Sequence, residues 1–224
     1  MKITWLTQAG LLIESGGLQV MIDPYLSDHV GKTGGKHRRI PVDETLFDLT
    51  PDVMVFTHDH ADHYDPETAP RFLEKKEKRM VVLSSHSCWQ KAREHGGPHN
   101  YVRFQAGAEW TEKDVRFISV PAEHSDPCAI GVIIEAEGKR LYITGDTLYS
   151  SSVLNALPFD VDYVFLPING AGNNMNAKDA ARFAAKTGAK YAVPLHYGLL
   201  DELTPDGFAF ENKIILTPYQ TIGI

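Results

Sequence analysis

The 224-residue chain has only two cysteines, Cys88 and Cys128, and they lie far apart in the sequence. Two isolated cysteines provide neither the disulfide framework of a small secreted domain nor the CxxC pair of a structural zinc site. Basic residues are not in excess either, because the formal net charge is -7. A protein that follows a phosphate backbone needs clustered positive charge, so we expect no nucleic acid partner.

Long apolar runs are absent as well. No stretch approaches the roughly 18 apolar residues of a membrane span, and the opening MKITWLTQAG lacks the apolar stretch of a signal peptide. We therefore expect a cytoplasmic protein without a membrane partner. With 43% hydrophobic residues the chain can bury a sizeable core, and we expect one domain over residues 1–224.

Two kinds of pattern follow each other along the chain. Short apolar runs between turn residues predict antiparallel strands at 2–7, 10–15, 18–23, 115–120, 128–136 and 140–145. Apolar strands alternate with helical segments elsewhere: strands at 52–57, 80–85, 161–168 and 191–195, and helices at 66–78, 88–95 and 177–188. This organisation indicates two sheets packed face to face with helices outside. Residues 27–45 are rich in Gly and charge, and we expect a loop there that lies over a site.

Three histidines and two aspartates lie within six residues, in the segment HDHADH at 58–63. A solvated turn needs one or two such residues and does not account for this set. Imidazole nitrogen and carboxylate oxygen suit zinc, manganese or iron. One short loop cannot complete two coordination spheres, so a metal centre here needs donors from elsewhere in the chain.

Three further candidate ligands each follow a predicted strand, as the HDHADH segment also does. These candidates are His124, Asp146 and His196. Taken singly, His124 and His196 would more often be hydrogen-bonded loop residues, and Asp146 would more often cap a turn. If the strands run in compatible directions, however, their carboxyl ends gather all seven donors at one edge of the sandwich. The joint pattern therefore favours a metal centre.

These segments together resemble the metallo-β-lactamase superfamily. The resemblance rests on HDHADH, on His124, on Asp146 in Thr-Gly-Asp-Thr and on His196 in Pro-Leu-His-Tyr-Gly, and it covers nearly the whole chain. The segments THDHADHYD and PLHYG, with the loop after VFLPI, resemble the branch that contains ascorbate-6-phosphate lactonase and N-acylphosphatidylethanolamine phospholipase D. The resemblance implies an α/β protein with an αββα four-layer sandwich and the activity of a metal-dependent hydrolase.

The resemblance also implies two divalent metal ions, zinc or manganese, with iron as a third option. The ligands implied for the first ion are His58, His60 and His124. Those implied for the second ion are Asp62, His63 and His196, and Asp146 would bridge both. The two metals would share a hydroxide, which attacks a small-molecule substrate such as a lactone or a phosphorylated metabolite. Asp62 would orient this hydroxide and accept its proton, which makes it the expected catalytic residue.

Several residues near these motifs have two interpretations. Asp23 either accepts a hydrogen bond from a metal ligand, as the resemblance implies, or is a turn residue before Pro24. Asp59 either orients a ligand, which we favour, or faces solvent. Tyr64 and Tyr197 would either reach a leaving group or, as is more common, pack.

Two loop segments carry the same ambiguity. Residues 170–174, with their small side chains and amides, either contact substrate or form an ordinary connection. The cationic run 36–39 either attracts an anionic substrate or forms a solvated face.

Three alternatives to this function stay open. A phosphodiesterase would direct the same hydroxide at phosphorus. A flavin-linked di-iron oxidoreductase shares the fold but resembles HxExD where this chain has HxHxD, so His60 favours hydrolysis. A non-catalytic metal-binding module would keep the ligands without turnover. The native metal, the substrate and the oligomeric state, including a homo-oligomer, are open at this point.

Overall fold

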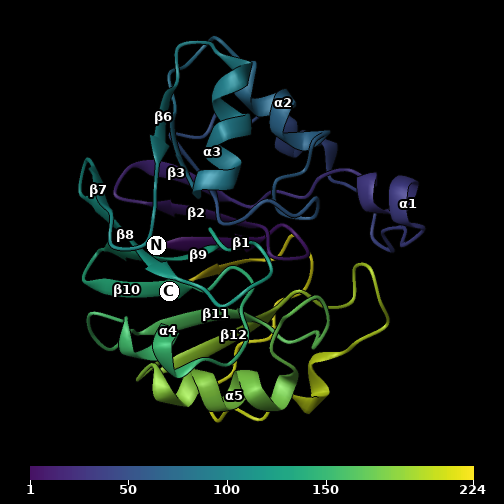
Figure 1. Cartoon of the computed structure of the whole chain (residues 1–224), viewed down its shortest axis with the longest axis vertical. Coiled ribbons are helices and arrows are strands. Elements are labelled where there is room, and N and C mark those ends of the chain that lie inside the picture. The colour runs from purple at the N-terminus through teal and green to yellow at the C-terminus, as the bar shows by residue number, and fades with distance from the viewer.

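Two mixed β-sheets stack against each other in the computed structural model, which describes residues 1–224 (Figure 1). Sheet A has seven strands in the order β13-β1-β2-β3-β4-β5-β6, and sheet B has six in the order β12-β11-β10-β9-β8-β7. Each sheet joins an antiparallel meander to a set of parallel strands.

The strands of sheet A are β1 (Lys2–Trp5), β2 (Leu11–Ser15), β3 (Leu18–Ile22), β4 (Val53–Phe56), β5 (Val81–Ser84), β6 (Asn100–Arg103) and β13 (Thr221–Gly223). Those of sheet B are β7 (Glu109–Glu112), β8 (Val115–Pro121), β9 (Ile130–Ala136), β10 (Lys139–Ile143), β11 (Tyr163–Pro167) and β12 (Tyr191–Leu195). The α-helices are α1 (His29–Gly34), α2 (Thr68–Leu73), α3 (His86–Ala92), α4 (Ser151–Asn155) and α5 (Ala177–Lys186). Short 3-10 helices cover Glu44–Asp48, Arg93–His95 and Pro205–Gly207.

The alternation of side chains along each strand separates two apolar clusters. On β4, Val53 and Val55 belong to a central cluster of 40 buried residues that draws on both sheets. Met54 and Phe56 belong to a second cluster of 16 residues, which includes residues of α2 and α3. Successive side chains of a strand point to opposite faces, so sheet A is covered on both sides. Each large side chain buried in this way contributes about 1.5–3 kcal/mol.

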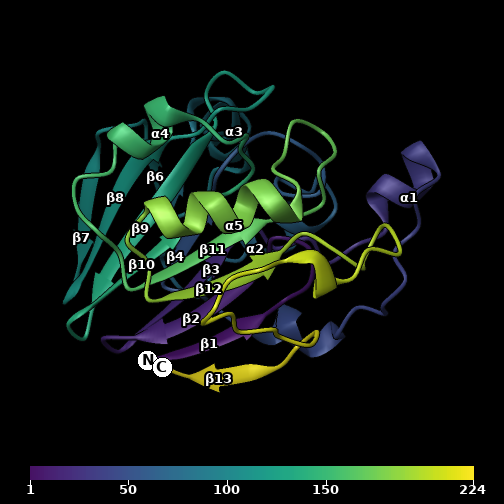
Figure 2. The same ribbon diagram turned by 90° about the horizontal axis from the view of Figure 1, so that it is seen from below.

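The helices lie on the outer faces of the two sheets. Figure 1 shows α2 and α3 against sheet A, and Figure 2 shows α5 lying across sheet B. Asn176 caps the N-terminus of helix α5, where its side chain accepts hydrogen bonds from the backbone amides of Lys178 and Asp179. Phe183 on this helix is buried in the central cluster. The predicted αββα four-layer sandwich is thus confirmed. None of the helices combines the length and the apolar character that a bilayer crossing requires.

Two local predictions were wrong. The helix expected over 66–78 covers only Thr68–Leu73, because the segment that follows is charged and offers few apolar side chains to bury. Asp65 still organises its start by accepting the amide of Glu67 at 3.0 Å. The expected loop at 27–45 contains α1 and the first residues of a 3-10 helix. Only Gly31 of α1 is buried, so the sequence carries no apolar periodicity that would indicate this helix.

Strand direction places the loops that carry the candidate ligands. In sheet A, β3 and β4 are parallel, so the loops that follow them leave by the same edge. In sheet B, β10, β11 and β12 are parallel, and β8 has the same direction because β9 is antiparallel to both β8 and β10. The loops after β8, β10 and β12 therefore leave sheet B together.

Candidate metal centre

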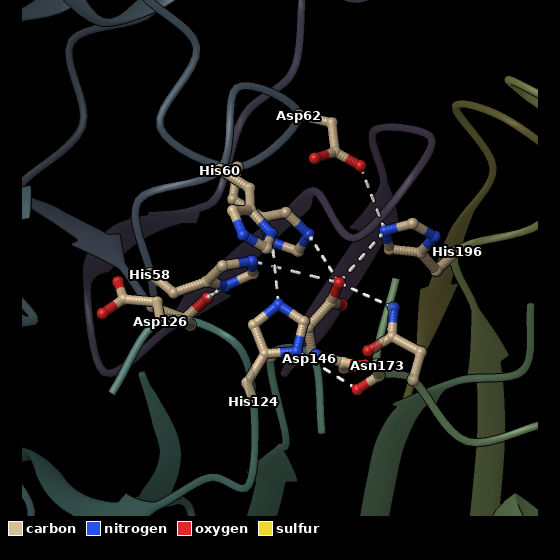
Figure 3. Close-up of polar contacts among 12 residues, drawn as sticks. His58, His60, Asp62, His124, Asp126, Asp146, Asn173 and His196 are labelled. Atoms are coloured by element: carbon tan, nitrogen blue, oxygen red, sulfur yellow. Dashed lines mark hydrogen bonds and ion pairs between the residues drawn. The ribbon is translucent and has the colours of Figure 1, made fainter. Parts of the chain in front are cut away.

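The structure brings the side chains of all seven predicted ligands together at the edge where the two sheets meet (Figure 3). The loop after β4 provides four of them: His58, His60, Asp62 and His63. The loops after β8, β10 and β12 provide one each: His124, Asp146 and His196. The donors are far apart in the sequence because four different strands end at this point.

Asp146 lies at the middle of the cluster. Its Oδ2 atom is 3.3 Å from Nε2 of His63 and 3.3 Å from Nε2 of His196. The same oxygen is 3.9 Å from Nε2 of His58. The amide of Asn174 donates a hydrogen bond to it at 2.7 Å. One carboxylate therefore faces histidines from both sets of donors, which is the geometry that a bridging ligand needs.

The other donors form two groups on either side of Asp146. Ligand atoms of His58, His60 and His124 all lie within 4.8 Å of one another, and so do those of Asp62, His63 and His196. In the first group, Nε2 of His124 is 3.1 Å from Nδ1 of His60. In the second, Nε2 of His196 is 3.1 Å from Oδ2 of Asp62. Each group has the spacing of a half-site for one cation.

Asp23, at the end of β3, orients two of the histidines. Its Oδ2 accepts a hydrogen bond from Nδ1 of His63 at 2.9 Å and another from the hydroxyl of Thr57. The Thr57 hydroxyl lies 3.1 Å from Nδ1 of His58. Both imidazoles thus use Nδ1 on the Asp23 side and present Nε2 to the centre. A hydrogen bond to the far ring nitrogen is the usual way in which proteins fix a metal-binding histidine.

Three buried atoms of the centre lack a hydrogen-bond partner. They are Nε2 of His58, Nε2 of His63 and Oδ1 of Asp146. Buried polar atoms normally have partners, so such orphans require an explanation. A cation would satisfy all three, because imidazole nitrogen and carboxylate oxygen are ligands of zinc, manganese and iron. The residues present fit a metal centre.

The electrostatics of the centre point the same way. Burial lowers the pKa of His58 well below its ordinary value, which leaves a neutral ring with a free lone pair. Burial alone would also lower the pKa values of His63 and His196, but the carboxylate of Asp146 and the neighbouring carboxylates have the larger, opposite effect. They raise the pKa of His63 well above its ordinary value and that of His196 to about 10. Buried negative charge thus dominates the centre and attracts cations.

Strained backbone gathers around the same point. The φ angles of Gln8, Asp23 and His196 are 49°, 41° and 60°, in the left-handed region that side chains with a Cβ seldom adopt. Each such residue costs on the order of 1–3 kcal/mol and persists only when its surroundings hold it. The amide of His196 donates to the carbonyl of Gln8 at 2.9 Å, which ties two of the three together.

Sequence reasoning missed several residues that hold the ligands. Gln8 donates to Oδ2 of Asp62 at 2.8 Å. Asp126 accepts the backbone amide of Asp59 at 3.0 Å and the hydroxyl of Ser87 at 2.5 Å, which links the HDHADH loop to the His124 loop and to α3. An isolated glutamine or aspartate in a loop carries no signal of such a role. Only the tertiary contacts reveal it.

The loop 170–174 positions ligands. Nδ1 of His124 lies 3.2 Å from the carbonyl of Asn173, and Asn174 holds Asp146 as described above. The interpretation of this loop as an ordinary connection between a strand and a helix is therefore incomplete, because the loop also holds two candidate ligands.

Three other residues near the motifs lie away from the centre. Asp59 pairs with Lys91 at 2.7 Å, so the prediction that it orients a ligand was wrong. Tyr64 packs on Phe56, with ring centroids 4.9 Å apart. The Tyr197 hydroxyl donates to the carbonyl of Leu216 at 3.3 Å. Neither tyrosine reaches the centre.

Beside the ligands lies a cavity of about 210 Å³. Four ligands line it: His60, Asp62, Asp146 and His196. Gln8 and Lys36 are among the other lining residues. A small molecule in this cavity would contact the metal ligands directly.

Gly145, directly before Asp146, provides a test of how tightly the centre is built. Its φ is +61°, and a Cβ added there would lie 2.9 Å from Oγ1 of Thr57 and 3.0 Å from the carbonyl oxygen of Ile130. We expect Gly145→Ala to lower the free energy of unfolding by about 2–4 kcal/mol, from backbone strain and overpacking together. Urea denaturation measures this change.

The matched control is Gly138→Ala in the β9–β10 hairpin. Gly138 has a φ of +70° but nothing within 4 Å of an added Cβ. We expect a loss of only about 1 kcal/mol there, from the left-handed backbone alone. Equal losses in the two variants would show that Gly145 is not tightly packed against Thr57.

Comparison with known proteins agrees with this geometry. Residues 19–197 match the model of the beta-lactamase superfamily domain. A UPF0173 metal-dependent hydrolase from Carboxydothermus hydrogenoformans is 30% identical over 95% of this chain and 92% of its own. Another from Ligilactobacillus salivarius is 33% identical over 92% of this chain and 89% of its own.

The metallo-beta-lactamase fold protein YhfI from Bacillus subtilis has a similar solved structure. It matches with a TM-score of 0.75 at 16% identity, over 99% of this chain and 98% of its own. An identity this low supports the fold alone, but the family model and the curated relatives cover the strands and loops that carry the seven donors. The chain therefore belongs to the metallo-β-lactamase superfamily.

Proposed function

We propose that this chain hydrolyses a small ester-like substrate, such as a lactone or a phosphorylated metabolite, with two divalent metal ions. The chain is a metal-dependent hydrolase of the metallo-β-lactamase superfamily, as its relatives are named. One observation carries the dinuclear proposal: Oδ2 of Asp146 faces His58 on one side and His63 and His196 on the other.

Each of the two groups of donors would bind one metal ion. The first group is His58, His60 and His124, and the second is Asp62, His63 and His196. Asp146 would serve both. When bound, the two cations lower the pKa of a water molecule towards neutrality and polarise the carbonyl or phosphoryl oxygen of the substrate. The unpartnered Nε2 atoms of His58 and His63 support this assignment.

Asp62 is the residue that we assign to proton transfer. It lines the cavity, and its Oδ2 atom is held by Gln8 at 2.8 Å and lies 3.1 Å from Nε2 of His196. A carboxylate held at the boundary between metal ligands and cavity can orient the attacking water and accept its proton. No serine or cysteine nucleophile is needed.

A substrate panel tests the proposal against the alternatives. Protein loaded separately with zinc, manganese or iron is assayed with lactones, phosphorylated esters, phosphodiesters and thioesters, and by oxygen consumption for an oxidoreductase. We expect hydrolysis of a lactone or of a phosphorylated ester. A preference for phosphodiesters would show that the protein is a phosphodiesterase, which is the nearest alternative. Protein that holds two metals and turns over nothing would fit a binding module instead.

Metal content gives a second test. We expect elemental analysis of gently purified protein to show close to two transition metal ions per chain, because seven donors exceed the needs of one tetrahedral site. Chelation of both ions should then lower the melting temperature by about 10–20 °C, since each ion at 100 times its Kd adds about 2.7 kcal/mol. A constant value of one ion per chain after metal supplementation would rule out the dinuclear centre.

A further inference from the structure

We propose that the substrate is a small anion and that Lys36 binds its charged group. The inference deepens the proposed function and rests on it. It starts from the cavity beside the metal ligands, which offers one unpaired cationic side chain.

The cavity suits a small molecule with polar groups. Its volume of about 210 Å³ is below the 300–1,000 Å³ that is typical of pockets for drug-sized ligands. Its apolar lining is limited to Val30, Ala171 and Leu200. The amides of Asn169 and Asn174 also line it, so polar side chains outnumber apolar ones among the lining residues. A long acyl chain would find little space here.

Lys36 is the only lysine or arginine that lines this cavity. It is exposed, and its side chain makes no hydrogen bond or ion pair, whereas Lys32 on the neighbouring α1 pairs with Glu67 at 2.6 Å. An ammonium group without a partner, next to a reactive centre, is available for the substrate.

Contacts of the residues that follow Lys36 hold it at the cavity. Asp28 accepts Nδ1 of His37 at 2.6 Å and the amide of Arg38 at 2.8 Å. The amide of Arg39 donates to the carbonyl of Leu199 at 2.9 Å. The rest of the cationic run thus anchors the loop, and Lys36 alone is left to face the ligand.

The charge balance of the loaded centre leaves the charge of Lys36 for an anion. Two divalent cations would carry four positive charges, which the carboxylates of Asp23, Asp62 and Asp146 and the bound hydroxide offset. A further lining carboxylate, Asp201, already accepts the amides of Gly198 and Leu203 through Oδ1. Lys36 is then the lysine at the cavity whose charge is available, and an anionic group is attracted to it.

A larger depression of about 730 Å³ at the opposite strand ends does not compete for this role. Its basic residues are largely neutralised, since Arg116 pairs with Glu135 at 2.7 Å and Lys190 with Asp162 at 2.7 Å. It also lacks histidines. The anion site that we infer is therefore the one beside the metal ligands.

A binding experiment tests Lys36 without reference to turnover. Metal-loaded protein is titrated calorimetrically with succinate and with succinamate, the half-amide that has one charge fewer. We expect wild type to prefer succinate and Lys36→Ala to lose about 10-fold of this preference, which corresponds to about 1.4 kcal/mol. Lys36→Arg should keep most of it, and the control Lys32→Ala should keep all of it. An unchanged preference in Lys36→Ala would overturn the inference.

Kinetics separates this failure from a failure of the proposed function. For an anionic ester and its neutral counterpart, we expect Lys36→Ala to lower the ratio of the two kcat/KM values about 10-fold, with Lys32→Ala at the wild-type ratio. If Lys36→Ala hydrolyses both esters with an unchanged ratio of kcat/KM values, the proposed hydrolysis is supported and Lys36 does not bind the charged group of the substrate. If Lys36→Ala loses the succinate preference but the wild-type protein hydrolyses none of the esters, the anion site is supported and the proposed hydrolysis is refuted.

Discussion

The Asp146→Ala variant is expected to lose both metal ions together and to lower kcat/KM by about 1,000-fold or more. Asp146 is buried and lies 3.3 Å from both His63 and His196. Removal of one partner from a buried charged interaction costs about 3–5 kcal/mol, which is about 100-fold to more than 1,000-fold in an equilibrium constant. Elemental analysis over a series of free metal concentrations measures the affinity, and steady-state kinetics measures the loss of activity.

Two matched variants show whether this effect comes from bridging. His124→Ala should weaken the first ion and spare the second, since His124 contacts His60 and not the Asp62 group. Asn174→Ala, which removes the 2.7 Å hydrogen bond to Asp146, should weaken metal binding only about 10- to 100-fold. Circular dichroism checks that each variant folds. If Asp146→Ala keeps one ion at wild-type affinity, Asp146 does not bridge.

The ligands could be predicted from the sequence because their chemistry and their position coincide. A histidine or an aspartate shortly after a strand carries two signals at once, its ligand chemistry and its position, and His58, His124, Asp146 and His196 all have both. Thr57 and Gln8 also lie at or after strand ends, but their side chains are not typical metal ligands. Thr57 lies 34 positions from Asp23, and Gln8 lies 54 positions from Asp62, so only the folded chain shows these contacts.

The layered fold could also be predicted from the sequence, because its buried strands have a clear apolar pattern. The apolar strands β4, β9 and β11 are almost fully buried, and their patterns predicted two sheets with helices outside. The missed elements are short and partly exposed. Strand β7 has exposed and half-buried residues in alternation, and β13 has three residues. Tertiary pairing at a sheet edge forms such strands, and a short segment without an apolar run carries too little pattern to indicate it.

The Asp62→Asn variant is expected to fold and to bind metal at raised concentrations, but to lose about 100-fold or more in kcat. Asparagine keeps the size of the side chain and one oxygen, which can still accept the hydrogen bond from Gln8. It removes the negative charge that faces His196 at 3.1 Å and the ability to take up a proton. The expected loss lies within the usual magnitude of general-base assistance.

Asp62→Asn could lower kcat either because metal is lost or because proton transfer is lost, and the experiment has to distinguish the two. The variant is therefore assayed at metal concentrations that restore two ions per chain, with melting curves to confirm an intact fold. Gln8→Ala is the matched control, because it removes the 2.8 Å hydrogen bond while the carboxylate stays, and we expect it to lose only about 10-fold. A fully loaded Asp62→Asn protein with wild-type kcat would show that the metals activate water without Asp62. A loss that disappears as metal is added would make Asp62 a ligand and nothing more.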